Sequence, residues 1–120
     1  EKYIRKIVEL CKKYNISVVF TTVIQDPQTV KEKVVSFQKA DNYIRGLAEE
    51  LDVEYYNFNG LKYEFFERDT NDFYDREGHM YGDTATRFTK IYGQVINESF
   101  NGGIRNDYFE RDLKVLYGEV

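Results

Sequence analysis

The chain has 120 residues, 42% of them hydrophobic and 17% aromatic, with one proline and no low-complexity run, which indicates one domain large enough for its own core. Its net charge is −4 and its basic residues are dispersed, so the basic surface needed for nucleic-acid binding is absent. No apolar run approaches the ~20 residues that cross a bilayer.

The chain begins with a helix followed by a strand. From Tyr3 to Tyr14, apolar residues recur every three or four positions, which predicts an amphipathic helix that ends at Asn15. The single cysteine, Cys11, lies on the apolar face and is expected to be a small buried residue. Residues 16–24 are β-branched and almost continuously apolar, which is typical of a strand buried on both faces of a parallel sheet.

The loop at 25–28 follows this strand at the edge where open α/β sheets bind ligands. Asp26 and Gln28 could therefore face a site. The favoured interpretation is structural: Asp26 precedes Pro27 in a turn, and Gln28 or Thr29 begins the next helix.

Residues 29–51 keep a helical spacing of apolar positions. We expect one long helix or a tight break, because Asp41 and Asn42 are good cap residues and could divide it into helices at about 29–38 and 41–51. Residues 53–58 then have strand composition and end at a turn pair, Asn59-Gly60. Two strands, each preceded by a helix, predict an α/β fold with parallel strands.

Residues 61–82 have no stable period, and we expect a structured active-site or binding loop ordered by its aromatic side chains, with a short helix near 62–68. A helix follows to about Phe100, with Asp83 as its expected N-cap and Gly102-Gly103 beyond its end. The tail at 104–120 could be a strand, a helix or a docking segment.

His79, the chain's only histidine, lies among several carboxylates just before this helix, where it could act as a general base. A divalent metal held by Asp69, Asp72, Asp75 and Glu77 is an alternative. The spacing lacks the central glycine and terminal glutamate of a calcium loop, so no metal site is predicted.

The runs Asp72-Phe73-Tyr74-Asp75 and 79–89 resemble the last conserved block of SGNH/GDSL-type hydrolases, in which an Asp-x-x-His pair precedes a helix. In this register His79 matches the catalytic histidine, Met80 the leucine, Ala85 the alanine, and Phe88-Thr89 the start of the packed helix.

The block departs from the family at the acid. Arg76 stands where the orienting aspartate is expected, and the nearest acids are Asp75, one residue further back, and Glu77. An extra residue such as Gly78 could bulge the loop and let Asp75 reach the imidazole. Tyr81 and Thr84 replace the usual asparagine and glycine.

The resemblance implies a flavodoxin-like (SGNH-type) three-layer sandwich, with residues 1–120 as one α/β domain or the C-terminal part of a larger one. It also implies a serine esterase or acyltransferase without a cofactor, in which His79 is the general base and Asp75 the orienting acid. An ester or acylated carbohydrate would be the substrate of the full-length protein. Whether the protein forms an oligomer, and whether the full-length protein is secreted or part of the cell envelope, is left open by the sequence.

The nucleophile of such an enzyme is missing from this chain, which has no Gly-Asp-Ser block. Its serines, Ser17, Ser36 and Ser99, fall in a predicted strand, a helix and a helix end, without the tight turn that a nucleophile needs. The chain also opens on Glu1 inside a helical pattern, as a piece of a longer protein would. We therefore expect this piece to be inactive alone.

The alternative function is a non-catalytic α/β binding or interaction module. Its contact surface would be the acidic, aromatic loop at 61–82, and His79 would be a capping or surface residue.

Overall fold

The computed structural model describes residues 1–118 as a mixed α/β fold around a two-stranded parallel sheet. The elements are α1 (Lys2–Lys13), β1 (Val19–Thr22), α2 (Pro27–Glu32), α3 (Val34–Leu51), β2 (Glu54–Asn57), α4 (Gly82–Phe100) and α5 (Leu113–Tyr117), with 3-10 turns at Phe58–Gly60 and Thr70–Asp72. The order of helices and parallel strands predicted from the first half of the sequence is confirmed.

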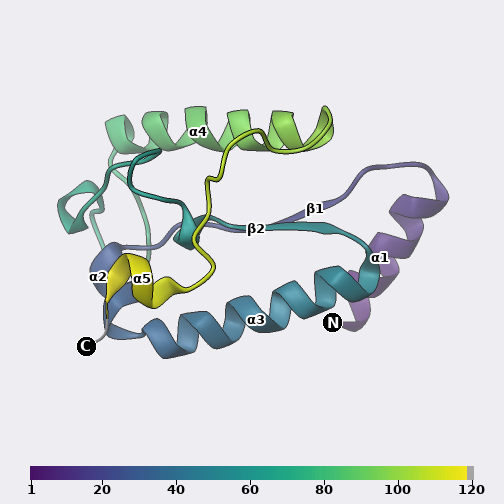
Figure 1. Ribbon diagram of the computed structural model, residues 1–120, viewed down its shortest axis with the longest axis horizontal. Helices are drawn as coiled ribbons and strands as arrows, with labels where there is room; N and C mark the ends of the chain where they lie inside the picture. The colour runs from purple at the N-terminus through teal and green to yellow at the C-terminus, as the bar shows by residue number, and fades with distance from the viewer. Residues whose placement is uncertain (119–120) are drawn as a thin grey trace.

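Helices lie on both faces of the sheet. Figure 1 shows α4 above it and α3 below it, with α1 near the end of α3. Consecutive side chains of β2 point to opposite faces of the sheet and reach these two layers. The Tyr56 hydroxyl is 3.0 Å from the Ser99 hydroxyl on α4, and the Tyr55 hydroxyl donates to Asp41 on α3 at 2.9 Å. The two-residue period of a strand thus joins both layers to the sheet.

The main core lies between α4, the sheet and the loop after β2. It is built largely from rings, and nine buried residues form it: Ile24, Tyr56, Phe58, Leu61, Phe66, Phe73, Phe88, Val95 and Tyr108. Phe66 and Phe73 come from the irregular segment 61–82, so its expected ordering by aromatic packing is confirmed. The short helix expected near 62–68 is wrong: this stretch makes a turn in which the N–H groups of Phe65 and Phe66 donate to the Lys62 carbonyl.

The second helical segment breaks at Lys33, where φ is −120° and ψ is 32°. A tight break was expected, but its placement at Asp41 and Asn42 is wrong. Asp41 lies in the middle of α3, buried, and accepts hydrogen bonds from Tyr55 and Arg45. Burial raises the pKa of Tyr55 to about 12, so its phenol stays protonated and continues to donate to this carboxylate.

The tail adds a second, smaller core. Leu113 and Tyr117 of α5 pack with Val30 and Val34 of α2 and α3. The end of the tail, at residues 119–120, lies outside the described residues. Among the described helices, none is both long and apolar enough to cross a membrane.

Three further expectations differ in detail from the structure. Strand β1 is shorter than the run at 16–24, and its side chains are only half-buried; within residues 1–118 it is flanked by one strand, β2. The N-cap position of helix α4 is Tyr81, which makes no capping hydrogen bond through its side chain, and Asp83 lies in the first turn instead. Cys11 is half-buried rather than buried.

Candidate functional site

His79 lies on a small hairpin-like loop that precedes α4. Phe73 and Met80 form an antiparallel bridge, and the Tyr74 N–H donates to the His79 carbonyl at 2.9 Å. Residues 75–78 therefore form the tip of a closed turn, and the imidazole leaves the chain on the returning side.

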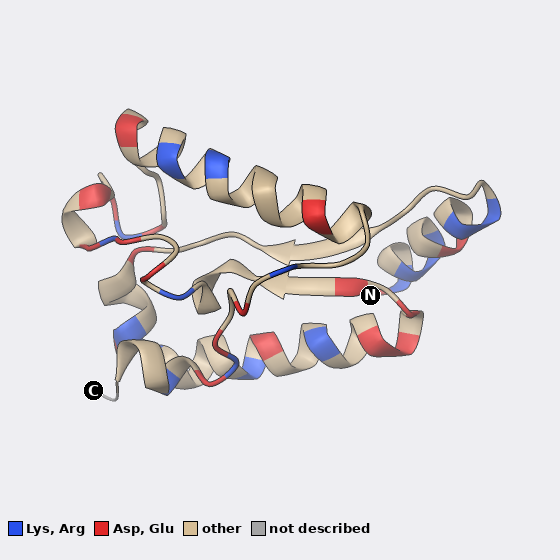
Figure 2. Ribbon diagram, turned by 45° about the horizontal axis from the view of Figure 1, so that its top comes forward, with Lys and Arg blue, Asp and Glu red and all other residues tan. Residues whose placement is uncertain are grey.

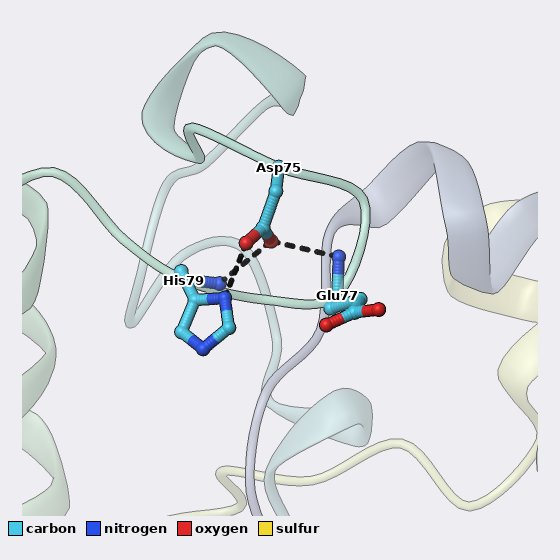
Figure 3. Close-up of side chains that lie close together, drawn as sticks. All are labelled: Asp75, Glu77 and His79. Atoms are coloured by element: carbon cyan, nitrogen blue, oxygen red, sulfur yellow. Dashed lines mark hydrogen bonds and ion pairs between the residues drawn. The ribbon is translucent and has the colours of Figure 1, made fainter.

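The tip of this turn is organised by the Asp75 carboxylate. One oxygen, Oδ1, accepts backbone N–H groups from Glu77 at 2.8 Å, Gly78 at 3.2 Å and His79 at 3.3 Å. The other oxygen, Oδ2, contacts Nδ1 of His79. Figure 3 shows the contacts of Asp75 with Glu77 and His79, with the second ring nitrogen pointing away from Asp75.

Gly78 gives the turn the extra residue that this contact needs. Its φ is +108°, a conformation that side chains disfavour. A Cβ there would lie 3.0 Å from the Gln25 side-chain oxygen and 3.0 Å from the Ile24 carbonyl. The sequence-based expectation that Gly78 lets Asp75 reach the imidazole is thus met in the geometry, while the catalytic roles of both residues stay predictions.

The electrostatics of Asp75 favour its ionised form. Partial burial raises the pKa of Asp75, but hydrogen bonds from the backbone N–H of Glu77 and from His79 outweigh it and hold the pKa below its ordinary value of 3.8. The acid is therefore a carboxylate at neutral pH. A carboxylate against Nδ1 favours the tautomer in which Nδ1 carries the proton and Nε2 has a free lone pair.

The imidazole borders an open groove of about 500 Å³. It is lined by Val23, Ile24, Gln25, Tyr74, Glu77, Gly78, His79, Met80, Ala85 and Phe88. Val23 to Gln25 directly follow β1, so the groove lies at the carboxyl end of the sheet, where α/β proteins commonly bind ligands. Most of the lining is apolar, and Tyr74 stacks on the His79 ring at 5.5 Å between centroids.

Arg76, which occupies the family position of the orienting acid, points away from the imidazole. Its Nε lies 3.0 Å from the fully buried Asp26 carboxylate, and its Nη2 is 2.7 Å from Glu32. Its carbonyl also accepts the Thr29 hydroxyl at 2.8 Å. Arg76 therefore attaches the histidine loop to α2.

Asp26 has a structural role, as the favoured sequence interpretation proposed. It caps α2 by accepting the Gln28 N–H at 3.2 Å, and it also accepts the Thr70 hydroxyl at 2.9 Å. Gln28 itself reaches Glu32 rather than the groove. The sequence did not predict the pairing of Asp26 with Arg76, because the two residues are 50 positions apart and no local pattern joins them.

The serines lie away from His79. Ser99 and Ser17 line a different groove at the amino end of β1, and Ser36 lies on α3 beside Lys33 and Val34. None of the three lines the histidine groove. Ser17 precedes β1 rather than lying within a strand.

The carboxylates considered for a metal are not gathered as one set. Asp69 and Asp72 form the capping box of the turn at 70–72. The grouping with ligand atoms within 4.8 Å of one another is instead Asp75, Glu77 and His79, drawn in Figure 3. In it, Nδ1 of His79 and both oxygens of Asp75 already contact each other or backbone N–H groups.

Comparisons of the chain with protein-family models, with curated proteins and with solved structures find no match.

Proposed function

We propose that this chain is the C-terminal part of an SGNH/GDSL-like serine esterase or acyltransferase and that it supplies the general base, His79. The observation that carries the proposal is the contact between the Asp75 carboxylate and Nδ1 of His79, beside an apolar groove at the carboxyl end of β1. The layers of α4, sheet and α3 are compatible with a flavodoxin-like sandwich.

In this proposal Nε2 of His79 takes the proton of a serine hydroxyl supplied by residues outside this chain. Asp75 keeps the imidazole in the required tautomer and stabilises the imidazolium after proton transfer. The apolar groove receives the acyl group of an ester or acylated carbohydrate, and no cofactor takes part.

The test compares two polypeptides. The present chain should neither react with a fluorophosphonate probe nor hydrolyse a p-nitrophenyl ester, because it has no suitably placed serine. In the full-length protein, His79→Ala should lower ester turnover roughly 10⁴- to 10⁶-fold, and Asp75→Asn up to ~10⁴-fold by favouring the wrong tautomer.

A matched control is Asp107→Asn, which removes an exposed carboxylate paired with Lys62 outside the groove and should leave turnover unchanged. Labelling of a serine in the present chain would show that a nucleophile had been overlooked. Unchanged turnover in the full-length His79→Ala variant would refute the general-base role.

A second candidate is a non-catalytic binding module that uses the loop at 61–82. It is favoured by the exposure of Tyr74 and Tyr81, whose rings lie 5.7 Å apart next to His79. Under this alternative, Tyr74→Ala weakens binding of a partner, and His79→Ala changes no ester turnover.

A further inference from the structure

The histidine turn holds three side chains of the kinds that bind metal ions. Asp75, Glu77 and His79 each offer one ligand atom, and these atoms lie within 4.8 Å of one another; Figure 3 shows the three side chains together. All three residues belong to one short turn at 75–79. The chain therefore supplies the whole group itself, and no part of a longer protein is needed to complete it.

Hydrogen bonds within the turn already position two of the three ligand atoms. Oδ1 of Asp75 accepts three backbone N–H groups of the turn, which leaves Oδ2 directed at Nδ1 of His79. Hydrogen bonds of this kind orient the carboxylates that ligate metal ions. An ion that binds here therefore meets an oxygen and a nitrogen that the chain has already ordered, with little further loss of conformational entropy.

The side chains of the turn leave this group without a compensating positive charge. Within residues 1–118 the exposed carboxylate of Glu77 has no hydrogen-bond or ion-pair partner. Arg76, the basic residue of the same turn, points to Asp26 and Glu32 instead. Helix α1, which carries five Lys or Arg residues, lies at the far end of the molecule from the start of α4, as Figure 2 shows. The turn thus presents two carboxylates and an imidazole to a cation.

The ligand types favour a transition-metal ion over calcium or magnesium. Zn²⁺ takes imidazole nitrogen and carboxylate oxygen as ligands, and it commonly binds three protein side chains and a water molecule. Ca²⁺ takes about six to eight oxygen ligands, and Mg²⁺ also prefers oxygen. Bonds of ~2.0–2.2 Å place the ligand atoms of a tetrahedral Zn²⁺ about 3.3 Å apart. Rotation of the exposed Glu77 side chain and a slight opening of the contact between Asp75 and His79 satisfy this spacing.

We propose that Asp75, Glu77 and His79 form a binding site for a divalent transition-metal ion of the zinc type. The ligands are Nδ1 of His79 and one oxygen of each carboxylate, and water completes the coordination. The ion takes the place of the proton on Nδ1. That proton is carried by Nε2 instead, so the imidazole neither gains nor loses a proton.

The bound ion blocks the general base, a consequence that rests on the proposed function. A general base needs a lone pair on Nε2 to take the proton of a serine hydroxyl. In the metal-bound tautomer this nitrogen already carries a proton, so His79 cannot accept another. Metal binding itself does not rest on the proposed function.

The binding test uses the present chain without an affinity tag and Zn²⁺ alone as the probe. Titration calorimetry should show one ion bound per chain, and Mg²⁺ and Ca²⁺ should each bind about ten-fold more weakly or less. Because His79 is the chain's only histidine, nitrogen NMR of the imidazole reports this site directly. We expect Zn²⁺ on Nδ1 and the proton on Nε2.

Protein variants identify the ligands. Glu77→Gln should weaken Zn²⁺ binding about ten-fold or more, and His79→Ala should abolish it. Glu64→Gln is the matched control, because Glu64 is an exposed glutamate of the loop at 61–82 outside the group. Cys11→Ser removes the chain's only thiol and should also leave the affinity unchanged. Circular dichroism checks that each variant is folded.

Four results would overturn the metal site. These are the absence of saturable Zn²⁺ binding, equal binding of Ca²⁺, an ion on Nε2 rather than Nδ1, and an affinity that Glu77→Gln does not change. Loss of binding in Cys11→Ser would assign the ion to the thiol instead.

The regulatory consequence is tested in the full-length protein. Saturating Zn²⁺ should lower ester turnover about ten-fold or more, and the ratio of turnover without and with Zn²⁺ should be smaller in Glu77→Gln. Zn²⁺ binding without any loss of turnover would refute the regulation. A full-length protein that binds Zn²⁺ at this site but has no turnover even without the ion would refute the proposed function and leave the metal site standing.

Discussion

Replacing Gly78 by alanine tests whether the turn holds Asp75 and His79 together. At φ +108° an added Cβ is disfavoured by ~1–2 kcal/mol or more. It would also lie 3.0 Å from the Ile24 carbonyl, a backbone atom that moves only with the end of β1. We therefore expect Gly78→Ala to lower the free energy of unfolding by about 2–3 kcal/mol and to loosen the contact between Asp75 and Nδ1.

The free energy is measured by urea unfolding, and NMR of the imidazole nitrogens reports the tautomer of His79. Gly93→Ala is the matched control, because Gly93 lies inside α4 with no atom within 4 Å of an added Cβ. It should raise stability by about 0.5–1 kcal/mol. If Gly78→Ala were as stable as the parent chain, with an unchanged imidazole, the turn would not depend on this glycine.

Three further changes test the contacts around the site and core. Asp26→Ala should lower the free energy of unfolding in urea by about 2–3 kcal/mol. This is less than the ~3–5 kcal/mol expected for breaking a fully buried ion pair, because Arg76 is exposed. Asp26→Asn should lower it less, because asparagine keeps the helix cap. The stability that protonated Tyr55 contributes is complete below pH 10 and lost toward about pH 12, so Tyr55→Phe should flatten the alkaline fall measured by thermal melts. The Arg105 N–H lowers the pKa of Glu98 below 4.5, so its contribution is present above that pH and lost in acid, and Glu98→Gln should flatten the acid limb.

The elements that local spacing specifies could be predicted from the sequence. The apolar spacing of α1 and α4, the β-branched run before α2 and the aromatic-rich run after α3 predicted which segments would be helices and strands, because such patterns reflect which faces are buried. The contact between Asp75 and His79 could also be predicted from the sequence, because the two residues and Gly78 lie within one short turn.

Features that depend on distant partners could not be predicted in this way. Asp41 resembles a helix cap in sequence, but Tyr55 from β2 supplies a hydroxyl that satisfies it within α3. Arg68 is likewise buried, donating to two carbonyls and to the Tyr117 hydroxyl, 49 residues away. Local propensity carries no information about such partners, so the sequence predicts a cap at Asp41 and gives no sign that Arg68 is buried.

The contacts of the histidine loop also restrict where a nucleophile could stand. The loop is fixed at its tip by the N–H groups around Asp75 and at its side by Arg76 on Asp26. The imidazole is therefore positioned by the chain itself, and Nε2 faces outward. A serine oxygen must lie ~2.6–3.2 Å from Nε2 to lose its proton to it. Under the proposed function, the loop that carries the serine would therefore have to reach the carboxyl end of β1 and meet the ring on the side away from Asp75.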